Sequence, residues 1–201
     1  MNKKILAVLF FVMLLSVVLS NENDDSKGKL SGITILMIIA KSDFRDEELL
    51  VPKSVFEKEK AKVVIASTTR SEIKGMLGAT VKPDILLNEV SVEDYDAVIF
   101  VGGSGSQQYF DDQSAHTVAS DADEKGKILG AICLAPNILA NAGVLKDKKC
   151  TCWGNPNNLK DNGANYTGKS VEKDGKIITA NGPAAAKEFA GTIIKALLEN
   201  R

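Results

Sequence analysis

A cysteine at the corner between a predicted strand and a predicted helix is the residue best placed to do chemistry. The apolar run 127–133 is typical of a buried strand that ends at Cys133, and the segment 135–143 has the features of a short helix with Pro136 near its start. Unpaired N–H groups and the positive dipole end of a helix favour a thiolate at such a place. The residues alone allow either a nucleophile or an inert buried thiol, which is common in protein cores.

A pair of glycines follows another predicted strand and is suited to the same chemistry. The run 96–105 is typical of a buried strand that leads into Gly102 and Gly103. In strand-turn-helix hydrolases, backbone N–H groups beside the nucleophile stabilise a developing oxyanion. We expect Leu134 to supply one such N–H group and Gly103 another.

Four buried strands separated by helices are predicted to position these residues. The strands are 33–40, 62–67, 96–105 and 127–133, the helices are 45–60, 112–126, 135–143 and 182–200, short strands lie in 71–90 and at 148–153, and a hairpin spans 170–180. This alternation predicts parallel β-α-β units in a three-layer sandwich. Ligands bind such sheets at the carboxyl ends of the strands, near a switch in strand order. Cys133, Gly102 and Gly103 should therefore meet around one crevice.

The composition is that of a globular protein and argues against two classes of partner. The chain has 201 residues, 44% hydrophobic and 25% charged, with a formal net charge of −1, which fits one domain with a sizeable core. It has no basic stripe with interleaved aromatic residues, so we expect no nucleic-acid partner. One histidine and the absence of paired CxxC motifs exclude a recognisable zinc site, and we expect neither a metal nor a cofactor.

Residues 1–20 have the form of a secretory signal peptide. Two lysines precede an apolar run at 5–19, and the small residues Val18 and Ser20 permit cleavage before Asn21. A membrane span needs about 20 apolar residues, so an uncleaved N-terminal anchor is the alternative. We expect an exported protein, secreted, periplasmic or in the cell envelope, that contacts the membrane only if this segment stays uncleaved.

The rest of the chain is predicted to be a linker followed by one domain. The polar segment 21–30 is typical of a solvated linker, and the folded domain is expected over 31–201. Three cysteines in an exported chain leave at least one thiol unpaired. Cys150 and Cys152 lie two residues apart and are either a strained disulfide or, as we favour, two small strand residues.

Several separated motifs resemble the ThiJ/PfpI superfamily. The stretch "AICLAP" with "ILANAGVLKDKK" resembles its nucleophile segment, "DFRDEELLVP" its first-helix motif and "VIFVGGSGS" its glycine turn. The stretch "VEKDGKIITANGPAAAKEFAGTIIKAL" is similar to the parkinsonism-associated deglycase branch. The resemblance covers roughly 33–199. It implies a flavodoxin-like three-layer sandwich with a mostly parallel sheet, of the class I glutamine amidotransferase type, and a homodimer.

The resemblance also assigns roles to individual residues. It makes Cys133 the reactive nucleophile and Glu48, four residues before a proline, the carboxyl group that hydrogen-bonds the sulfur and tunes its acidity. Gly102 and Gly103 then line the site, with the Gly103 N–H in the oxyanion role. A carboxyl group beside a thiolate should have a raised pKa, because like charge and burial both disfavour ionisation. Without the resemblance, Glu48 would be interpreted as an exposed charge of the acidic cluster 46–48.

The sequence departs from the family at a histidine. Protease-like members carry it directly after the cysteine, where Leu134 stands, and the deglycase branch carries it where Trp153 stands. His116 falls in the predicted helix 112–126 and is interpreted as a surface or packing residue. We expect Trp153 to narrow the pocket, although a core aromatic at a strand end is the alternative. Proton transfer then falls to Glu48 or water, which disfavours a cysteine peptidase because amide cleavage must protonate the leaving amine.

Two classes of function remain open. In the first, Cys133 of a cofactor-independent glyoxalase or deglycase attacks small reactive carbonyls, such as methylglyoxal, or glycated protein side chains. In the second, a non-enzymatic redox-sensing or chaperone-like protein uses oxidation of Cys133 to sulfenic and sulfinic acid, with Glu48 donating a hydrogen bond to the product. We favour the enzyme, because the nucleophile and the glutamate of the family are both present.

Overall fold

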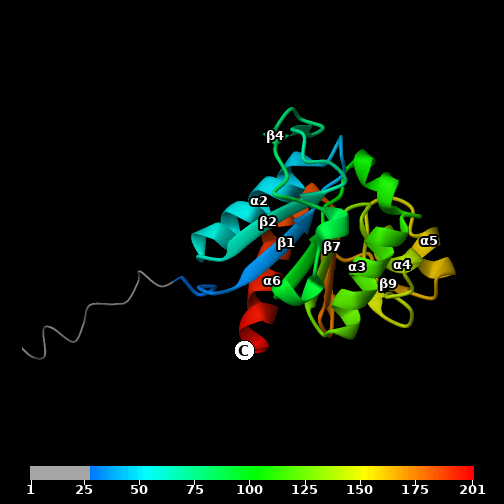
Figure 1. Ribbon diagram of the computed structural model, residues 1–201. Helices are drawn as coiled ribbons and strands as arrows, with labels where there is room; N and C mark the ends of the chain where they lie inside the picture. The colour runs from blue at the N-terminus through cyan, green and yellow to red at the C-terminus, as the bar shows by residue number, and fades with distance from the viewer. Residues whose placement is uncertain (1–27) are drawn as a thin grey trace, which may run out of the picture.

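The computed structural model describes residues 28–201 as a twisted sheet with helices on both faces (Figure 1). The main sheet contains β1 (Thr34–Ile38), β2 (Lys62–Ser67), β5 (Ile85–Leu86), β6 (Ala97–Phe100), β7 (Ile128–Ile132), β10 (Val171–Asp174) and β11 (Ile177–Ala180). Their spatial order is β10-β11-β7-β6-β1-β2-β5. All neighbours pair in parallel except β10, which is antiparallel to β11. The predicted α/β class and mostly parallel sheet are confirmed.

The strands β1, β2, β6 and β7 lie within the four runs that were predicted to be buried strands. Every residue of β6, β7 and β11 is buried. A parallel sheet covered on both sides requires this composition, because neither face of its strands meets water. β2 has the predicted bounds 62–67, and the predicted hairpin forms β10 and β11 with Asp174 paired to Ile177 across its turn.

The helices form the two outer layers. On one face α2 (Asp46–Lys58) packs against α6 (Ala186–Glu199), and on the other lie α3 (Gln113–Glu124), α4 (Pro136–Asn141) and α5 (Asn157–Asp161) (Figure 1). A 3-10 turn, η4 (Pro183–Ala185), precedes α6, so Pro183 opens the helical segment as expected. The three predicted layers are therefore present.

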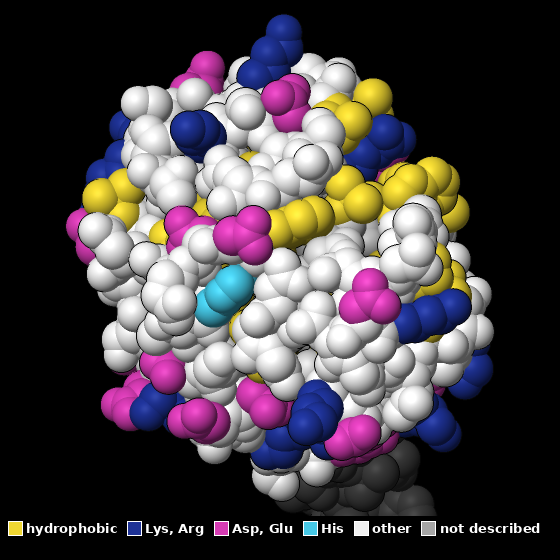
Figure 2. All heavy atoms as spheres, turned by 90° about the vertical axis from the view of Figure 1, so that its right-hand side faces the viewer, with side chains coloured by type: hydrophobic (Ala, Val, Ile, Leu, Met, Phe, Trp, Pro, Cys, Tyr) yellow, Lys and Arg dark blue, Asp and Glu magenta, His cyan; other side chains and the backbone are white. Residues whose placement is uncertain are grey.

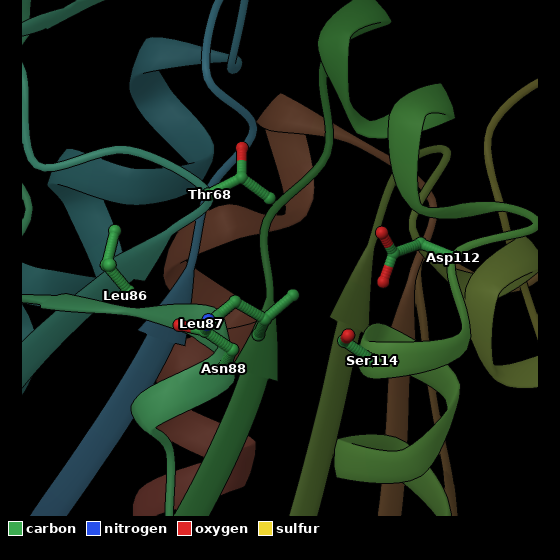
Figure 3. Close-up of a pocket in the computed structure, with 6 residues that line it drawn as sticks. All are labelled: Thr68, Leu86, Leu87, Asn88, Asp112 and Ser114. Carbon is green, nitrogen blue, oxygen red and sulfur yellow. The ribbon is translucent and has the colours of Figure 1, made fainter.

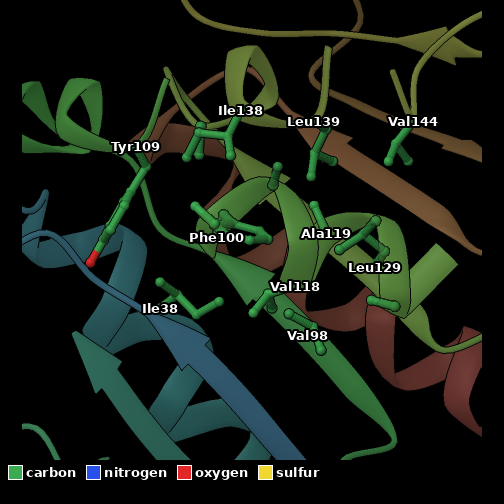
Figure 4. Close-up of a cluster of buried hydrophobic side chains, with 14 of the residues drawn as sticks. Ile38, Val98, Phe100, Tyr109, Val118, Ala119, Leu129, Ile138, Leu139 and Val144 are labelled. Carbon is green, nitrogen blue, oxygen red and sulfur yellow. The ribbon is translucent and has the colours of Figure 1, made fainter. Parts of the chain in front are cut away.

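Two apolar cores join these layers. The core between the sheet and the α3/α4 layer includes Phe100 and Leu129 from the strands and Ile138 from α4 (Figure 4). The Tyr109 hydroxyl in this core donates a hydrogen bond to the Ile39 carbonyl at 2.9 Å, which satisfies its buried polar atom. The second core lies under α2 and α6 and contains the side chain of Cys133.

Short elements account for the main differences from the sequence prediction. The segment 71–90 contains β3 (Ile73–Lys74), β4 (Thr80–Val81) and β5, with the 3-10 turn η1 (Leu87–Glu89) after them, while η2 (Val92–Asp94) and η3 (Ser104–Tyr109) flank β6. The predicted strand 148–153 shortens to β8 (Lys149–Cys150), which pairs with β9 (Asn165–Tyr166). The helix α5 was not predicted, because its segment is rich in asparagine, which competes for backbone hydrogen bonds and weakens a helical pattern.

The predicted signal peptide or anchor at residues 1–20 lies outside the described residues, as does most of the predicted linker 21–30. Leu30, assigned to that linker, is fully buried, and its N–H donates to the Glu59 carbonyl at 2.8 Å. The chain therefore joins the domain slightly before residue 31. From residue 28 onward, no helix is long and apolar enough to cross a membrane.

The charges of the described surface are mixed. On the face shown in Figure 2, lysine and arginine side chains alternate with aspartate and glutamate, and no broad area of one sign is visible. Within residues 28–201, no three or more histidine, cysteine, aspartate or glutamate side chains cluster closely enough to hold a metal ion. The face in Figure 2 therefore offers no broad charged area as a functional site, and the described residues offer no cluster of metal ligands.

Candidate active site

Cys133 occupies a strained turn directly after β7. Its φ angle is +65°, a conformation that costs a residue with a Cβ atom about 1–2 kcal/mol. Two backbone hydrogen bonds hold it there: the Cys133 N–H donates to the Ala180 carbonyl, and the Trp153 N–H donates to the Cys133 carbonyl, each at 2.8 Å. A strained backbone persists only where the surrounding structure holds it in place, and such residues cluster at functional sites.

The Gly102–Gly103 turn after β6 brings the thiol and the carboxyl group together. A Cβ atom added at Gly102 would lie 2.5 Å from Glu48 Oε2 and 2.6 Å from the Cys133 Cβ, so only glycine fits. Gly103 adopts a φ of +100°, which favours glycine as well. The Gly102 carbonyl accepts a hydrogen bond from the Arg45 N–H at 3.0 Å, which ties the turn to the start of α2.

Glu48 lies in the first turn of α2 and is fully buried. The helix continues through Pro52, although a proline in a helix interior usually kinks or ends it. A proline lacks the N–H that would bond to the carbonyl four residues earlier, here that of Glu48. Burial of Pro52, Leu49 and Phe56 offsets this loss. The exposed-charge interpretation of Glu48 is therefore wrong.

The carboxyl group of Glu48 shares its environment with the Cys133 sulfur. Within residues 28–201, no hydrogen bond of good geometry reaches either carboxyl oxygen. Burial raises the pKa of Glu48 to about 7, while the neighbouring Cys133 thiol, Arg45 and the Gly102 backbone oppose that rise. The predicted raised pKa is thus present, and its main cause is burial.

The Cys133 thiol is less acidic than the helix start alone predicts. Burial first, and then the charge of Glu48, raise its pKa to about 12, whereas the N–H groups of Gly103 and Leu134 lower it. The expectation of an acidic thiol neglected burial and the carboxylate. Below about pH 7, Glu48 carries its proton, so it no longer repels a thiolate and can donate a hydrogen bond to the sulfur.

A cavity of about 230 Å³ opens above the thiol. Its walls are Arg45, Glu48, Met76, Gly103, Ser104, Cys133, Leu134, Trp153 and Pro183. Most of these residues lie after the carboxyl ends of β1, β6, β7 and β11, while Met76 and Trp153 come from two flanking loops. The structure thus brings the sequence-predicted site residues around the single predicted crevice, with Gly102 just beneath its wall.

Leu134 and Trp153 replace the family histidine with apolar walls. Leu134 is half-buried, and Trp153 is 57% exposed, so the tryptophan is a cavity wall and not a core residue. Its ring packs on Gly182, where an added Cβ atom would lie 3.0 Å from Trp153 Cε3. The described wall therefore offers Glu48 as its one acid or base beside the thiol.

Sequence reasoning missed Arg45 and Met76 as cavity residues. Arg45 stands three residues before Glu48 in the quoted first-helix motif, which was a usable signal. Met76 lies at the tip of the hairpin between β3 and β4, which Asp46 fastens to α2 by accepting hydrogen bonds from the N–H groups of Leu77 and Ala79, each at 2.8 Å. No local pattern places this hairpin over the site.

His116 lies away from the site, as predicted. It is half-buried on α3, and its Nε2 lies 2.7 Å from the Phe110 carbonyl oxygen. A separate cavity of about 210 Å³ near the start of α3 is lined by Thr68, Leu86, Leu87, Asn88, Asp112 and Ser114 (Figure 3). Asp112 already accepts a hydrogen bond from the Ala115 N–H of α3, and the lining includes no thiol.

Cys150 and Cys152 are free thiols buried in the core on the α3/α4 side. Their pKa values are raised to about 11, chiefly by burial. The interpretation as a small strand residue is confirmed for Cys150, at the end of β8, and is wrong for Cys152, which lies in the loop after it. The two cysteines form no disulfide with each other.

The fold and the site together define an α/β protein with a cysteine on a strained strand-to-helix turn beside a buried carboxyl group. The chain belongs to the DJ-1/PfpI family, whose family model matches residues 33–196. The solved structure of a ThiJ/PfpI domain protein from Brachyspira murdochii superposes with a TM-score of 0.81 at 32% identity, covering 83% of this chain and 96% of that one. The flavodoxin-like fold implied by the resemblance is thereby confirmed.

Relatives with curated sequences extend the comparison. An uncharacterized protein of Methanocaldococcus jannaschii is 36% identical over 202 residues, covering 98% of each chain. A protein of Pyrococcus horikoshii named a deglycase is 29% identical, covering 81% of this chain and 98% of its own length. A Caenorhabditis elegans protein named a glutathione-independent glyoxalase is 25% identical, covering 81% of this chain and 87% of its own length.

Proposed function

We propose that this chain is a cysteine-dependent, stress-protective enzyme that converts reactive carbonyl compounds, in the manner of a glyoxalase or deglycase. The main support is the shared cavity of a strained Cys133 and a fully buried Glu48. The names of the Pyrococcus and Caenorhabditis relatives support the same substrate class. Small dicarbonyls such as methylglyoxal, and early adducts on protein side chains, are the proposed substrates.

The first step is addition of sulfur to the aldehyde carbon. The Cys133 thiolate forms the C–S bond, and the carbonyl electron pair moves onto oxygen. The N–H groups of Gly103 and Leu134, which donate to no backbone carbonyl among the described residues and act on the Cys133 sulfur, are available for that oxyanion. The protonated Glu48 carboxyl group then supplies the proton that completes a hemithioacetal.

The second step is an internal redox rearrangement. The Glu48 carboxylate removes the proton from the former aldehyde carbon and, through an enediol, returns it to the neighbouring ketone carbon. The hydroxyl proton of the hemithioacetal moves to the former ketone oxygen. The first carbon is oxidised to a thioester while the second is reduced to an alcohol, so no external oxidant or reductant is needed. Water then cleaves the thioester, which releases lactate from methylglyoxal and restores the thiol.

Direct measurement of lactate tests this function. The domain from Asn21 would be incubated with methylglyoxal as wild type, Cys133→Ser, Glu48→Gln and the matched control Cys152→Ser, whose thiol lies outside the cavity. We expect lactate from wild type and from Cys152→Ser, none from Cys133→Ser and a strongly reduced amount from Glu48→Gln. Equal lactate from wild type and Cys133→Ser would contradict the proposal.

Redox sensing is the second candidate. Peroxide oxidises a thiolate to sulfenic acid with release of hydroxide, and a second peroxide gives sulfinic acid with release of water. The observation that favours it is the buried Glu48 carboxyl group, which lacks another partner in residues 28–201 and could donate a hydrogen bond to the oxidised sulfur. Mass spectrometry after peroxide titration should then find two added oxygens on Cys133 and none on Cys150. Equal oxidation of both would exclude it.

Export and dimerisation remain proposals. The export proposal is supported by the signal-like form of residues 1–20. Fractionation with N-terminal sequencing should find a chain that begins near Asn21 outside the cytosol; an intact N-terminus in the cytosolic fraction would contradict export. Sedimentation of the mature domain tests the homodimer, and a monomer at micromolar concentration would contradict it.

A further inference from the structure

Arg45 is the only cation among the described residues that line the Cys133 cavity, and the proposed mechanism does not use it. Its backbone is fixed on two sides. The N–H donates to the Gly102 carbonyl at 3.0 Å, and the carbonyl accepts from the Glu48 N–H at 3.1 Å. The side chain therefore extends from a rigid point between the glycine turn and the catalytic carboxyl group.

The guanidinium group is oriented but not saturated. Its Nε and Nη2 donate to the two carboxyl oxygens of Glu47 at 2.8 and 3.0 Å. A guanidinium has five N–H donors, so three remain after this pair forms. In residues 28–201, Nη1 has no acceptor, and the Arg45 side chain is 29% exposed. One edge of the group is thus held by Glu47 while the other stays free.

The cavity around this edge suits a small anion with an apolar body. Met76, Leu134, Trp153 and Pro183 form its apolar walls. Glu48 is uncharged below about pH 7, because burial raises its pKa to about 7. An anion then meets no charged carboxylate among the described lining residues, and the apolar walls strengthen its attraction to the Arg45 cation.

We propose that Arg45 makes this cavity selective for reactive carbonyl compounds that carry a carboxylate. The free edge of the guanidinium binds the carboxylate through two parallel hydrogen bonds, a geometry that arginine provides and lysine does not. The apolar walls hold the intervening carbons while the carbonyl carbon meets the Cys133 sulfur. This inference deepens the proposed carbonyl chemistry and rests on it.

A matched pair of dicarbonyls tests the selectivity. 4,5-Dioxopentanoate and 2-oxopentanal have the same five-carbon skeleton and differ in whether it ends in a carboxylate or a methyl group. We expect kcat/KM of wild type to favour the carboxylate compound by about 10- to 100-fold, the range for a hydrogen bond to a charged group. Arg45→Gln should bring the ratio to about one, and Arg45→Lys should give an intermediate ratio.

Arg70→Gln is the matched control. It removes the same charge from an arginine that pairs with Glu89 outside this cavity, so its ratio should equal that of wild type. A ratio near one in wild type, or equal losses on both compounds in Arg45→Gln, would overturn the inference and leave the carbonyl activity standing.

A second measurement does not depend on turnover. Iodoacetate and iodoacetamide alkylate the same thiol and differ mainly in charge. The rate with iodoacetate divided by the rate with iodoacetamide at Cys133 therefore reports attraction of the anion by Arg45. We expect Arg45→Gln to lower that ratio by about 3- to 10-fold and Arg70→Gln to leave it unchanged. If neither dicarbonyl is converted while the alkylation ratio falls, the proposed function fails and the anion subsite stands. An unchanged alkylation ratio would overturn the subsite.

Discussion

Cys133 and the pair Cys150 and Cys152 lie in two regions of one domain that differ in backbone and neighbours, not in burial. All three thiols are buried, and burial raises the pKa of each. Cys133 alone has a positive φ, of +65°, and alone among them lines a cavity that holds a carboxyl group. The other two pack in the apolar core on the α3/α4 side.

The comparison shows that a reactive cysteine cannot be recognised from its pKa alone. By that value Cys133, raised to about 12, would rank behind Cys150, raised to about 11. Cys133 differs from Cys150 because its neighbours can shift the equilibrium between thiol and thiolate. Protonation of Glu48 removes a repelling charge, and the N–H groups of Gly103 and Leu134 favour the thiolate. Among residues 28–201, no comparable carboxyl group and N–H pair act on the Cys152 thiol, whose pKa is raised by burial alone.

The largest predicted effect is the loss of carbonyl turnover when Cys133 is replaced, and it tests directly whether Cys133 differs from the other two cysteines. Cys133→Ser should lower carbonyl turnover by at least about 1,000-fold, because it removes the atom that forms the covalent bond. Cys152→Ser and Cys150→Ser should stay within about 3-fold of wild type per folded molecule. Turnover assays on all three variants, with circular dichroism to verify folding, decide this. A comparable loss in Cys152→Ser would mean that the two regions do not differ in the way described.

The next effect concerns the neighbour that separates the regions. Glu48→Gln should lower turnover by about 100-fold or more, the usual contribution of a positioned acid or base. The thiol, the cavity walls and the backbone N–H groups stay in place in this variant. Steady-state kinetics with methylglyoxal measures the loss, and unchanged kcat would remove Glu48 from the mechanism.

The same substitution has a predicted effect on stability that depends on pH. The pKa of Glu48 is raised in the folded chain from 4.5 to about 7, so its contribution to stability is full below about pH 4.5 and is lost as pH rises through 7. At pH 8 Glu48→Gln should therefore be more stable than wild type by about 3 kcal/mol, and at pH 4 nearly equal to it. Urea unfolding at both pH values measures the difference in stability between the variant and wild type. A difference that does not depend on pH would contradict the raised pKa of Glu48 in the folded chain.

The smallest predicted effects are the stability changes caused by two glycine-to-alanine substitutions, one beside the site and one in α6. Gly102→Ala places a Cβ atom against Glu48 and the Cys133 Cβ and should destabilise the fold by about 1–3 kcal/mol. Gly191→Ala, in α6 with open space around the added atom, should instead stabilise it by about 0.5–1 kcal/mol. Thermal unfolding of both variants provides the check. Equal shifts would show that the close packing at Gly102 has no energetic weight.

The fold could be predicted because its strands carry continuous apolar runs. β2 matches its predicted bounds, and α6 follows its predicted proline. The segment around α5 and β9 could not be predicted, because its asparagines give neither a period of two nor one of 3.6.

The candidate site could be predicted in part. The motifs indicated Cys133 and Glu48, since both lie in contiguous stretches with a recognisable pattern. Met76 could not be found, because only tertiary structure carries its hairpin over the cavity. The direction of the thiol pKa was also missed, since burial of Cys133 depends on α2 and the glycine turn packing against it.

The coupling of Cys133 to Glu48 is tested most directly by the pH dependence of alkylation at Cys133, resolved by peptide mass spectrometry. If the pair shares one proton, the iodoacetamide rate in wild type should rise with pH and level off near pH 7, where the pair has released its first proton. In Glu48→Gln the rate should continue to rise about tenfold per pH unit beyond that point. Profiles of the same shape in both proteins would contradict the account.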